Sequence, residues 1–202
     1  MAKDWIAETL YSNGVLKNKL GIKDKKQLAA TEYLISAERA LLLLQMHLRV
    51  EKINDLHKIH YFMFSPLYDW AGQERWGDFA KGNTTFYPYQ RFAFARQNID
   101  NFLEDLPPKK PLQSITYAEL LDRINFYHPF REGNGRSTKV FLQCLAAEHH
   151  QVIDYPYHND AMIEAQNAAD VKGLAKLIKL ENTPDRAAAF ERLILSNQKI
   201  KD

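Results

Sequence analysis

Apolar residues spaced three or four positions apart recur along most of this chain, and this helical periodicity is the strongest constraint on its fold. It predicts helices over residues 24–49, 54–64 and 89–106. The prolines that follow residue 106 end the third of these, because proline has no amide hydrogen for a helix interior. The pattern therefore indicates an all-α fold.

The second half of the chain continues in the same way. Thr116 and Glu119 have capping-box spacing, which predicts a helix that opens at Thr116. Thr183 followed by Pro184 predicts the start of a last helix. Further helices are expected over residues 135–149, 159–169, 171–181 and 183–198.

One segment, residues 76–89, departs from this pattern because it is rich in aromatic residues and threonine. It predicts a short β-hairpin that turns at Gly82-Asn83. We call this hairpin the flap; its residues are Phe79, Lys81, Gly82, Asn83, Thr84, Thr85 and Phe86.

The absence of repeats and long linkers predicts a single domain over residues 1–202. We divide it into an N-terminal lead-in (1–23), a helical core (24–180) and a C-terminal helix (183–198). With 46% hydrophobic residues among 202, the chain has enough apolar material for a sizeable core.

Charge and composition exclude several classes of protein. The net charge of +2 gives no broad cationic surface, so direct nucleic-acid binding is not expected. The single cysteine, Cys144, excludes an internal disulfide framework. Residues 1–10 lack the apolar stretch of a secretory signal, and the apolar run 40–44 is far shorter than the roughly 20 residues that span a membrane. We therefore expect a cytoplasmic protein without membrane contact.

Chemistry-bearing residues concentrate between two of the predicted helices, in the segment His-Pro-Phe-Arg-Glu-Gly-Asn-Gly-Arg-Ser-Thr-Lys (128–139). A helix begins in this segment, and its unpaired amide groups favour an anion. Gly133 and Gly135 let a ligand approach the backbone, and Asn134 adds an amide donor. Arg136 presents a planar fork of donors for phosphate oxygens. The segment is typical of a phosphate-binding loop.

Two further residues suggest an active site beside this loop. Glu132 is placed to hold a Mg²⁺ ion that bridges phosphate oxygens, and His128 to accept a proton near neutral pH. Each residue alone has an ordinary interpretation: a surface histidine, a plain turn, a solvated pair of charges. Six such residues at fixed offsets arise by chance at roughly one position in 10⁷, so the joint pattern favours function.

The stretch from His128 to Arg136 resembles the signature of the Fic (filamentation induced by cAMP) family, H-P-F-x-[D/E]-G-N-G-R-x-x-R. Residues 15–22 and 64–72 are also similar to family segments, and the resemblance covers about residues 11–180. It implies a mostly helical fold with a β-hairpin flap. It also implies a protein adenylyltransferase, which moves AMP from its co-substrate ATP to a Tyr, Ser or Thr hydroxyl of a target protein.

The resemblance assigns a role to each residue of the loop. His128 would be the general base, Glu132 the Mg²⁺ ligand and Arg136 a ligand of the outer phosphates. The anion hole would consist of Gly133, Asn134 and Gly135, and the flap would dock the target. Lys139 stands where the family has its second arginine; it keeps the charge and lacks the fork, and we count it among the nucleotide-binding residues.

Many Fic proteins carry an inhibitory helix with the pattern [S/T]-x-x-x-E-[G/N], which this sequence lacks at both ends. By resemblance, the chain would be the toxin of a toxin–antitoxin pair, inhibited by a small antitoxin that supplies this helix in trans. Its target would by the same resemblance be a type II topoisomerase, DNA gyrase or topoisomerase IV.

Three alternatives remain open. Some relatives are kinases or phosphocholine transferases; the kinase-type motif has lysine in place of Gly135, which favours AMP transfer here. If Lys139 impairs catalysis, the chain would be a nucleotide-binding or protein-binding module. Metal ligation is disfavoured for two histidine pairs without further ligands, His57/His60 and His149/His150.

Overall fold

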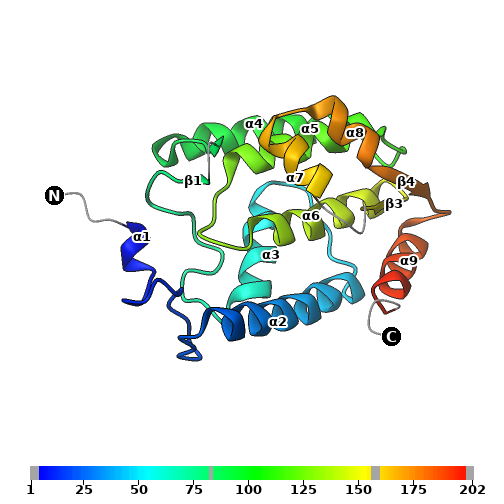
Figure 1. Cartoon of the computed structure of the whole chain (residues 1–202). Coiled ribbons are helices and arrows are strands. Elements are labelled where there is room, and N and C mark those ends of the chain that lie inside the picture. Colours follow the sequence, from blue (N-terminus) through cyan, green and yellow to red (C-terminus); the bar gives the residue numbers. More distant parts are fainter. Residues whose placement is uncertain (1–4, 82–83, 156–159, 199–202) are drawn as a thin grey trace.

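Helices account for most of the computed structural model, which describes residues 5–81, 84–155 and 160–198 (Figure 1). The helices are α1 (Trp5–Glu8), α2 (Lys25–Gln45), α3 (Asn54–Phe64), α4 (Phe92–Glu104), α5 (Ser114–Tyr127), α6 (Asn134–Glu148), α7 (Asp160–Asn167), α8 (Val171–Leu177) and α9 (Arg186–Gln198), with a 3₁₀ turn at Tyr89–Arg91. The strands are β1 (Ala80–Lys81), β2 (Thr84–Thr85), β3 (Gln151–Asp154) and β4 (Lys179–Asn182). The predicted all-α class is confirmed.

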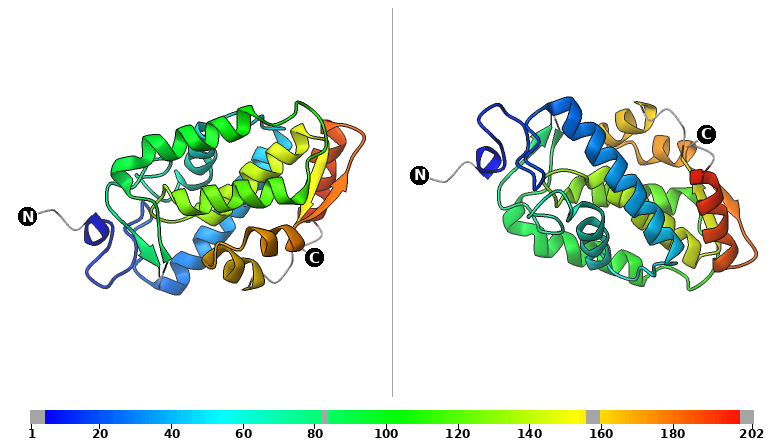
Figure 2. Two further views of the ribbon diagram at one scale, coloured as in Figure 1. Left: turned by 90° about the horizontal axis from the view of Figure 1, so that it is seen from above. Right: turned by 90° about the horizontal axis from the view of Figure 1, so that it is seen from below.

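Helix α6 lies at the centre and packs against α3, α5, α9 and β3. The two views of Figure 2 show it between the long helix α2 on one side and α5 on the other. Most of its residues are buried, and Phe141, Leu142 and Cys144 have no exposed surface. This burial fixes the position of its N-terminus, where the predicted phosphate-binding loop ends.

The predicted flap is confirmed as an antiparallel hairpin. Ala80 pairs with Thr85 and Lys81 with Thr84. The amide of Phe86 also donates to the carbonyl of Phe79, 3.2 Å away. The predicted turn at Gly82-Asn83 lies outside the described residues.

A second two-stranded sheet, β3 with β4, was not predicted. Residues 171–181 were expected to be one helix; α8 instead ends at Leu177, and Ile178 takes an extended conformation. The following residues pair antiparallel with β3, with Leu180 opposite Ile153. The segment becomes a strand because β3 buries Val152 and Ile153 and leaves an edge that needs hydrogen-bond partners.

Two predicted helix starts are wrong by a few residues. Helix α5 begins at Ser114, and the amide of Thr116 donates to the carbonyl of Gln113 inside the first turn, so Thr116 is not a cap. The C-terminal helix, predicted to start at 183, begins at Arg186. There the carboxylate of Asp185 accepts from the amide of Ala188, 2.9 Å away, which is capping geometry.

Helix α2 also differs from the prediction in the face that it buries. Leu42 and Met46 continue the apolar spacing from Leu28, but they are 40% and 65% exposed. The helix instead buries two polar residues, Glu32 and Ser36. Both contact Arg136 of α6, as described below.

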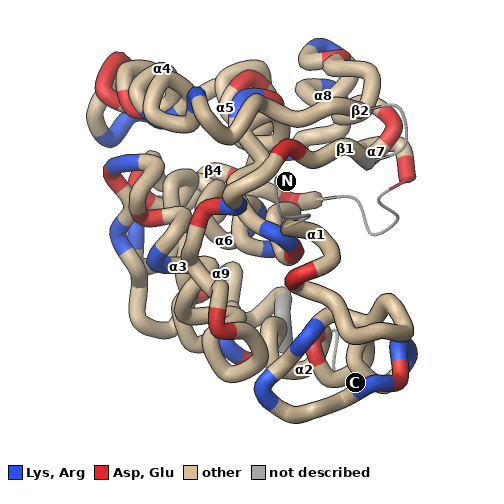
Figure 3. Tube along the Cα trace, turned by 90° about the vertical axis from the view of Figure 1, so that its left-hand side faces the viewer, with Lys and Arg blue, Asp and Glu red and all other residues tan. Residues whose placement is uncertain are grey.

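Basic and acidic residues are interspersed over the face shown in Figure 3, as expected from 27 basic and 25 acidic residues. Among the helices in the described part of the chain, none combines the length and apolar character needed to cross a bilayer.

Candidate active site

The loop between α5 and α6 is bracketed by two residues in the left-handed conformation. His128 ends α5 with φ 43° and ψ 60°, and its amide donates to the carbonyl of Ile124. Gly133 precedes α6 with φ 81°. A left-handed residue other than glycine is unfavourable unless its surroundings hold it. The histidine at position 128 is therefore constrained by its neighbours.

Asn134 closes the loop on itself. Its side-chain oxygen accepts from the amide of Phe130 at 2.9 Å, and its side-chain nitrogen donates to the Phe130 carbonyl at 2.8 Å. One of the two N–H donors of this side-chain amide is therefore used within the loop. The backbone amide of Asn134 still belongs to the first turn of α6, where amides lack helical acceptors.

The two glycines of the loop serve different needs. A Cβ atom at Gly133 would lie 2.6 Å from the ring of Phe64, whereas one at Gly135 would meet nothing within 4 Å. Gly133 is thus required by packing and by its positive φ. Gly135 is exposed, and without a Cβ atom its backbone is open to solvent.

A cavity of about 300 Å³ lies at the N-terminus of α6. It brings together the predicted nucleotide-binding and metal-binding residues, Glu132, Gly133, Asn134, Gly135, Arg136 and Lys139. Side chains from α5 and α7 complete its wall, among them Ile124 and Met162. A lining that combines cations and a helix N-terminus with apolar side chains suits a ligand with an anionic part and a less polar part.

The guanidinium of Arg136 is held by residues of α2. It forms an ion pair and hydrogen bond with Glu32 and donates to the hydroxyl of Ser36 at 3.2 Å. The hydroxyl of Tyr68 donates to the second oxygen of Glu32. Because its side chain is still 34% exposed, Arg136 presents part of its donor fork to the cavity.

Glu132 has the accessible carboxylate of this loop. Its side chain is 49% exposed, accepts from the amide of Gly133 at 3.0 Å and lies 3.6 Å from Arg136. Its exposed carboxylate at the cavity wall is the kind of hard oxygen ligand that Mg²⁺ prefers.

His60, one of the histidines considered for metal ligation, supports the loop instead. Its Nδ1 accepts from the amide of Gly72 at 2.8 Å, and its Nε2 donates to the carbonyl of Glu132 at 2.9 Å. The ring stacks on Phe130 with centroids 3.7 Å apart. Burial lowers the pKa of His60 to about 3, so the neutral ring holds both hydrogen bonds at physiological pH.

The imidazole of His128 lies beneath the flap. Phe86 stacks on it with centroids 3.6 Å apart and planes 14° apart, and Phe79 lies at 5.9 Å. His128 is half-buried, whereas Phe86 is only 5% exposed. Phe86 was predicted to dock the target, but its side chain covers the histidine; Thr85 is exposed.

Lys139 lies at the cavity wall with its ammonium 5.3 Å from the ring centroid of Tyr155. Burial lowers the pKa of this ammonium. A point charge over an aromatic face is less directional than a guanidinium fork. Lys139 therefore supplies charge to the cavity without fixed bidentate geometry.

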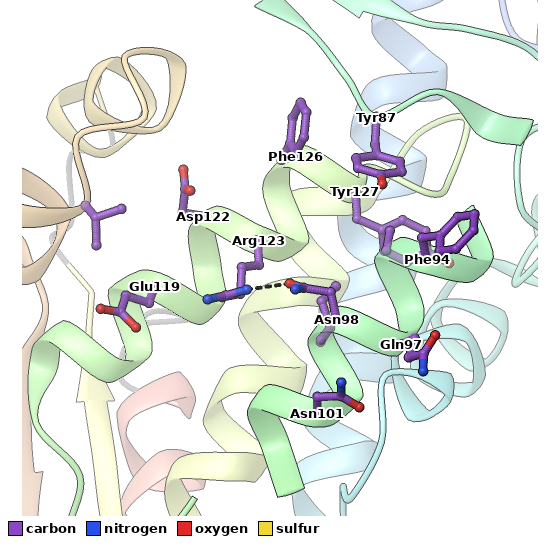
Figure 4. A pocket seen from close by; sticks show the side chains of 13 residues that line it. Tyr87, Phe94, Gln97, Asn98, Asn101, Glu119, Asp122, Arg123, Phe126 and Tyr127 are labelled. Atoms are coloured by element: carbon purple, nitrogen blue, oxygen red, sulfur yellow. Dashed lines mark hydrogen bonds between the residues drawn. The ribbon is translucent and has the colours of Figure 1, made fainter. Parts of the chain in front are cut away.

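A larger groove of about 690 Å³ lies between α4 and α5 (Figure 4). In the close-up, Arg123 reaches across it to Asn98, and Tyr87 stands near Phe126 at one end. Residues 128–139 do not line this groove. Helix α5 therefore separates the groove from the cavity that holds the loop residues.

Sequence reasoning missed the residues that support the loop from a distance. Glu32, Tyr68 and Arg75 are all buried or nearly so, and His60 was considered only as a metal ligand. A carboxylate at position 32 of the buried face of α2 was the available signal, because a buried charge requires a partner.

Substitution of the two glycines tests their separate roles. We expect Gly133→Ala to lower the free energy of unfolding by about 1–3 kcal/mol, through the contact with Phe64 and the left-handed backbone. Gly135→Ala should keep the fold and weaken binding of Mg²⁺ with the ATP analogue AMPPNP. Urea unfolding and calorimetric titration measure the two effects. Equal destabilisation of both variants would contradict the packing argument.

The buried His60 predicts a pH dependence of stability. Its native pKa of about 3 lies below the usual 6.5, so below pH 6.5 protons bind the unfolded chain preferentially. This group should therefore reduce the free energy of unfolding by about 1 kcal/mol between pH 7.5 and 5.5. His60→Phe should be less stable at pH 7.5 but lose less on acidification. Parallel urea-unfolding curves for both proteins over this range would refute the assignment.

The sequence and fold were compared with those of known proteins. Residues 50–146 match the sequence profile of the Fic/DOC family. Over 139 residues the chain is 30% identical to the "Probable protein adenylyltransferase Fic" of Salmonella typhimurium, a match that covers 65% of this chain and 68% of that protein. It is 32% identical over 150 residues to the protein adenylyltransferase VbhT of Bartonella schoenbuchensis, covering 70% of this chain and 31% of VbhT. The chain thus spans about a third of the length of VbhT.

A solved structure shares the fold. The crystal structure of BepC from Bartonella tribocorum, with bound AMPPNP, superposes with a TM-score of 0.73 at 20% sequence identity. The superposition covers 87% of this chain and 98% of the BepC chain. The predicted helical architecture with a hairpin flap is therefore shared with a protein of known structure.

Proposed function

The chain belongs to the Fic/DOC family, and on this premise we propose that it is a protein adenylyltransferase that transfers AMP from ATP to a hydroxyl side chain of a target protein. The observation that carries the proposal is that one cavity of about 300 Å³ is lined by a helix N-terminus, a carboxylate and two cations. Such a set suits a metal-bound triphosphate. The relatives named adenylyltransferases support the same activity.

His128 is the proposed general base. It lies five residues before Gly133, at the α5 end of the loop, and Phe86 holds its ring plane. In the reaction the imidazole takes the proton of the target hydroxyl, and the oxygen forms a bond to the α-phosphorus of ATP. The bond between that phosphorus and the oxygen that bridges to the β-phosphate breaks, and pyrophosphate leaves.

The loop residues supply the charge stabilisation that this displacement requires. The amides at the start of α6, including those of Gly135 and Arg136, point to the anion, and Lys139 adds a positive charge at the cavity wall. Arg136 binds outer phosphate oxygens with the donors that Glu32 leaves available. When bound through Glu132 and the phosphates, Mg²⁺ would neutralise charge on the pyrophosphate.

The flap is the proposed docking element for the target. Because Phe79 and Phe86 face His128, their side chains are not available to read the target sequence. Recognition would then fall to the hairpin backbone, which can pair with an extended segment, and to Thr85. This arrangement brings a target hydroxyl to the edge of the imidazole.

The main test compares two histidines in the left-handed conformation, one at the C-cap of α5 and one directly after the C-cap of α6. His128 and His150 have φ values of 43° and 57°, and asparagine tolerates this conformation in both places. We expect His128→Asn to lower AMP transfer by about 10²–10⁴-fold, and His150→Asn to leave it unchanged. The measurement is the incorporation of α-phosphate-labelled ATP into bacterial lysate proteins and purified DNA gyrase, with mass spectrometry of the product.

The position of the label separates the alternatives. A mass gain equal to AMP supports the proposal. Label that enters only from the γ-phosphate would identify a kinase. Absence of transfer by the wild-type chain, together with intact binding of AMPPNP, would identify a binding module.

We further propose that this chain is a toxin whose inhibitor is a separate small protein, with a type II topoisomerase as its target. The proposal rests on the absence of the pattern [S/T]-x-x-x-E-[G/N] from the sequence. Expression in bacteria should stop growth, the neighbouring gene product should restore it, and His128→Asn should be harmless. Normal growth with the wild-type chain alone would contradict the proposal.

A further inference from the structure

Arg75, in the segment between α3 and the flap, is only 2% exposed, and its side chain reaches three separate backbone segments. Its Nε donates to the carbonyl of His128 at 2.9 Å. Its two terminal nitrogens donate to the carbonyls of Gly77 and Tyr87. Its own amide donates to the carbonyl of Pro129 at 2.7 Å. One residue therefore joins both ends of the flap to the end of α5.

The three carbonyls lie where the proposed reaction needs a fixed geometry. Gly77 precedes the flap and Tyr87 follows it, so their positions determine the position of the hairpin. His128 and Pro129 are the first residues of the loop, and the backbone of His128 is left-handed. Because that conformation is unfavourable for histidine, hydrogen bonds to both carbonyls help to hold it.

The guanidinium of Arg75 lies over the ring of Phe92. Its central carbon lies 4.8 Å from the ring centroid of Phe92, at the start of α4. A planar fork stacked on an aromatic ring can direct donors to several carbonyls at once, which the single ammonium of lysine cannot reproduce. The geometry thus depends on arginine rather than on positive charge alone.

We propose that Arg75 is a positioning residue that sets the imidazole of His128 relative to the flap, so that a target segment on the flap presents its hydroxyl to the base. This inference rests on the proposed adenylyltransferase function. Arg75 acts through backbone carbonyls and does not line the 300 Å³ cavity. It should therefore affect the rate of transfer and leave nucleotide binding unchanged.

Arg186 provides a matched control. It too lies 4.8 Å from a phenylalanine ring centroid, that of Phe190, and donates to a backbone carbonyl, that of His47. It lies on α9, outside the residues that form the loop, the flap or the cavity. It differs in that its Nε pairs with the carboxylate of Glu148, 2.6 Å away. Replacing each arginine by lysine removes a guanidinium that lies over a phenylalanine ring and donates to a backbone carbonyl.

The test uses the full chain with Arg75→Lys or Arg186→Lys. For Arg75→Lys we expect AMP transfer to fall about tenfold or more, because a displacement of about 1 Å is enough for such a loss. The affinity for AMPPNP with Mg²⁺ should stay within about twofold of wild type. Hydrogen–deuterium exchange should accelerate in residues 77–87, whereas Arg186→Lys should change neither transfer nor exchange of this segment.

Three outcomes would overturn the inference: transfer within twofold of wild type, loss of AMPPNP affinity equal to the loss of rate, or unchanged exchange in residues 77–87.

If Arg75→Lys does not fold, Phe92→Leu removes the aromatic ring under the guanidinium and leaves the arginine in place. It should accelerate exchange in residues 77–87 and lower transfer by a few fold, and no change in either would overturn the inference. If the wild-type chain transfers no AMP, the proposed function fails, and the exchange measurement alone decides whether Arg75 holds the flap.

Discussion

The candidate site depends on the two hydrogen bonds between the side chain of Asn134 and the backbone of Phe130. They join the start of α6 to the middle of the loop, so the loop cannot open without leaving buried polar groups unpaired. Phe130 has no exposed surface and stacks on His60, which also holds the carbonyl of Glu132. Burial of one aromatic side chain and the pairing of one amide therefore fix the backbone that presents both the carboxylate and the amides of the cavity.

Buried polar side chains packed against the loop hold the charged side chain of Arg136 in position. Glu32 binds Arg136 and accepts from Tyr68, and a carboxylate so placed is stable only while both partners remain. The ion pair restricts the conformations of the Arg136 side chain. This lowers the free energy needed to arrange its donors around an anion. Arg75 has the equivalent effect on the other side of the loop, where all of its acceptors are carbonyls. Arg75 thus anchors the start of the loop, and the ion pair between Glu32 and Arg136 lies at its end.

The predictions from sequence succeeded where the signal is local. Helical periodicity, the flap and the segment 128–139 are each contained in a short stretch, and the structure places Gly135, Arg136 and Lys139 around one cavity. Local capping signals still misplaced the starts of α5 and α9 by a few residues. The larger failures involve contacts between distant residues. The pairing of β3 with β4 joins segments about 25 residues apart, and Glu32 meets Arg136 across 104 positions. Neither contact leaves a periodic pattern in the sequence, and a polar residue on a helix face does not indicate its partner.

The loop also lies between helix ends of opposite polarity. His128 caps the C-terminus of α5, where the partial negative charge of the helix favours a cation, and the amides of α6 begin at Asn134, where the partial charge is positive. In the proposed reaction, positive charge that develops at the α5 end of the loop and negative charge at the α6 end would each lie next to the helix terminus of opposite partial charge.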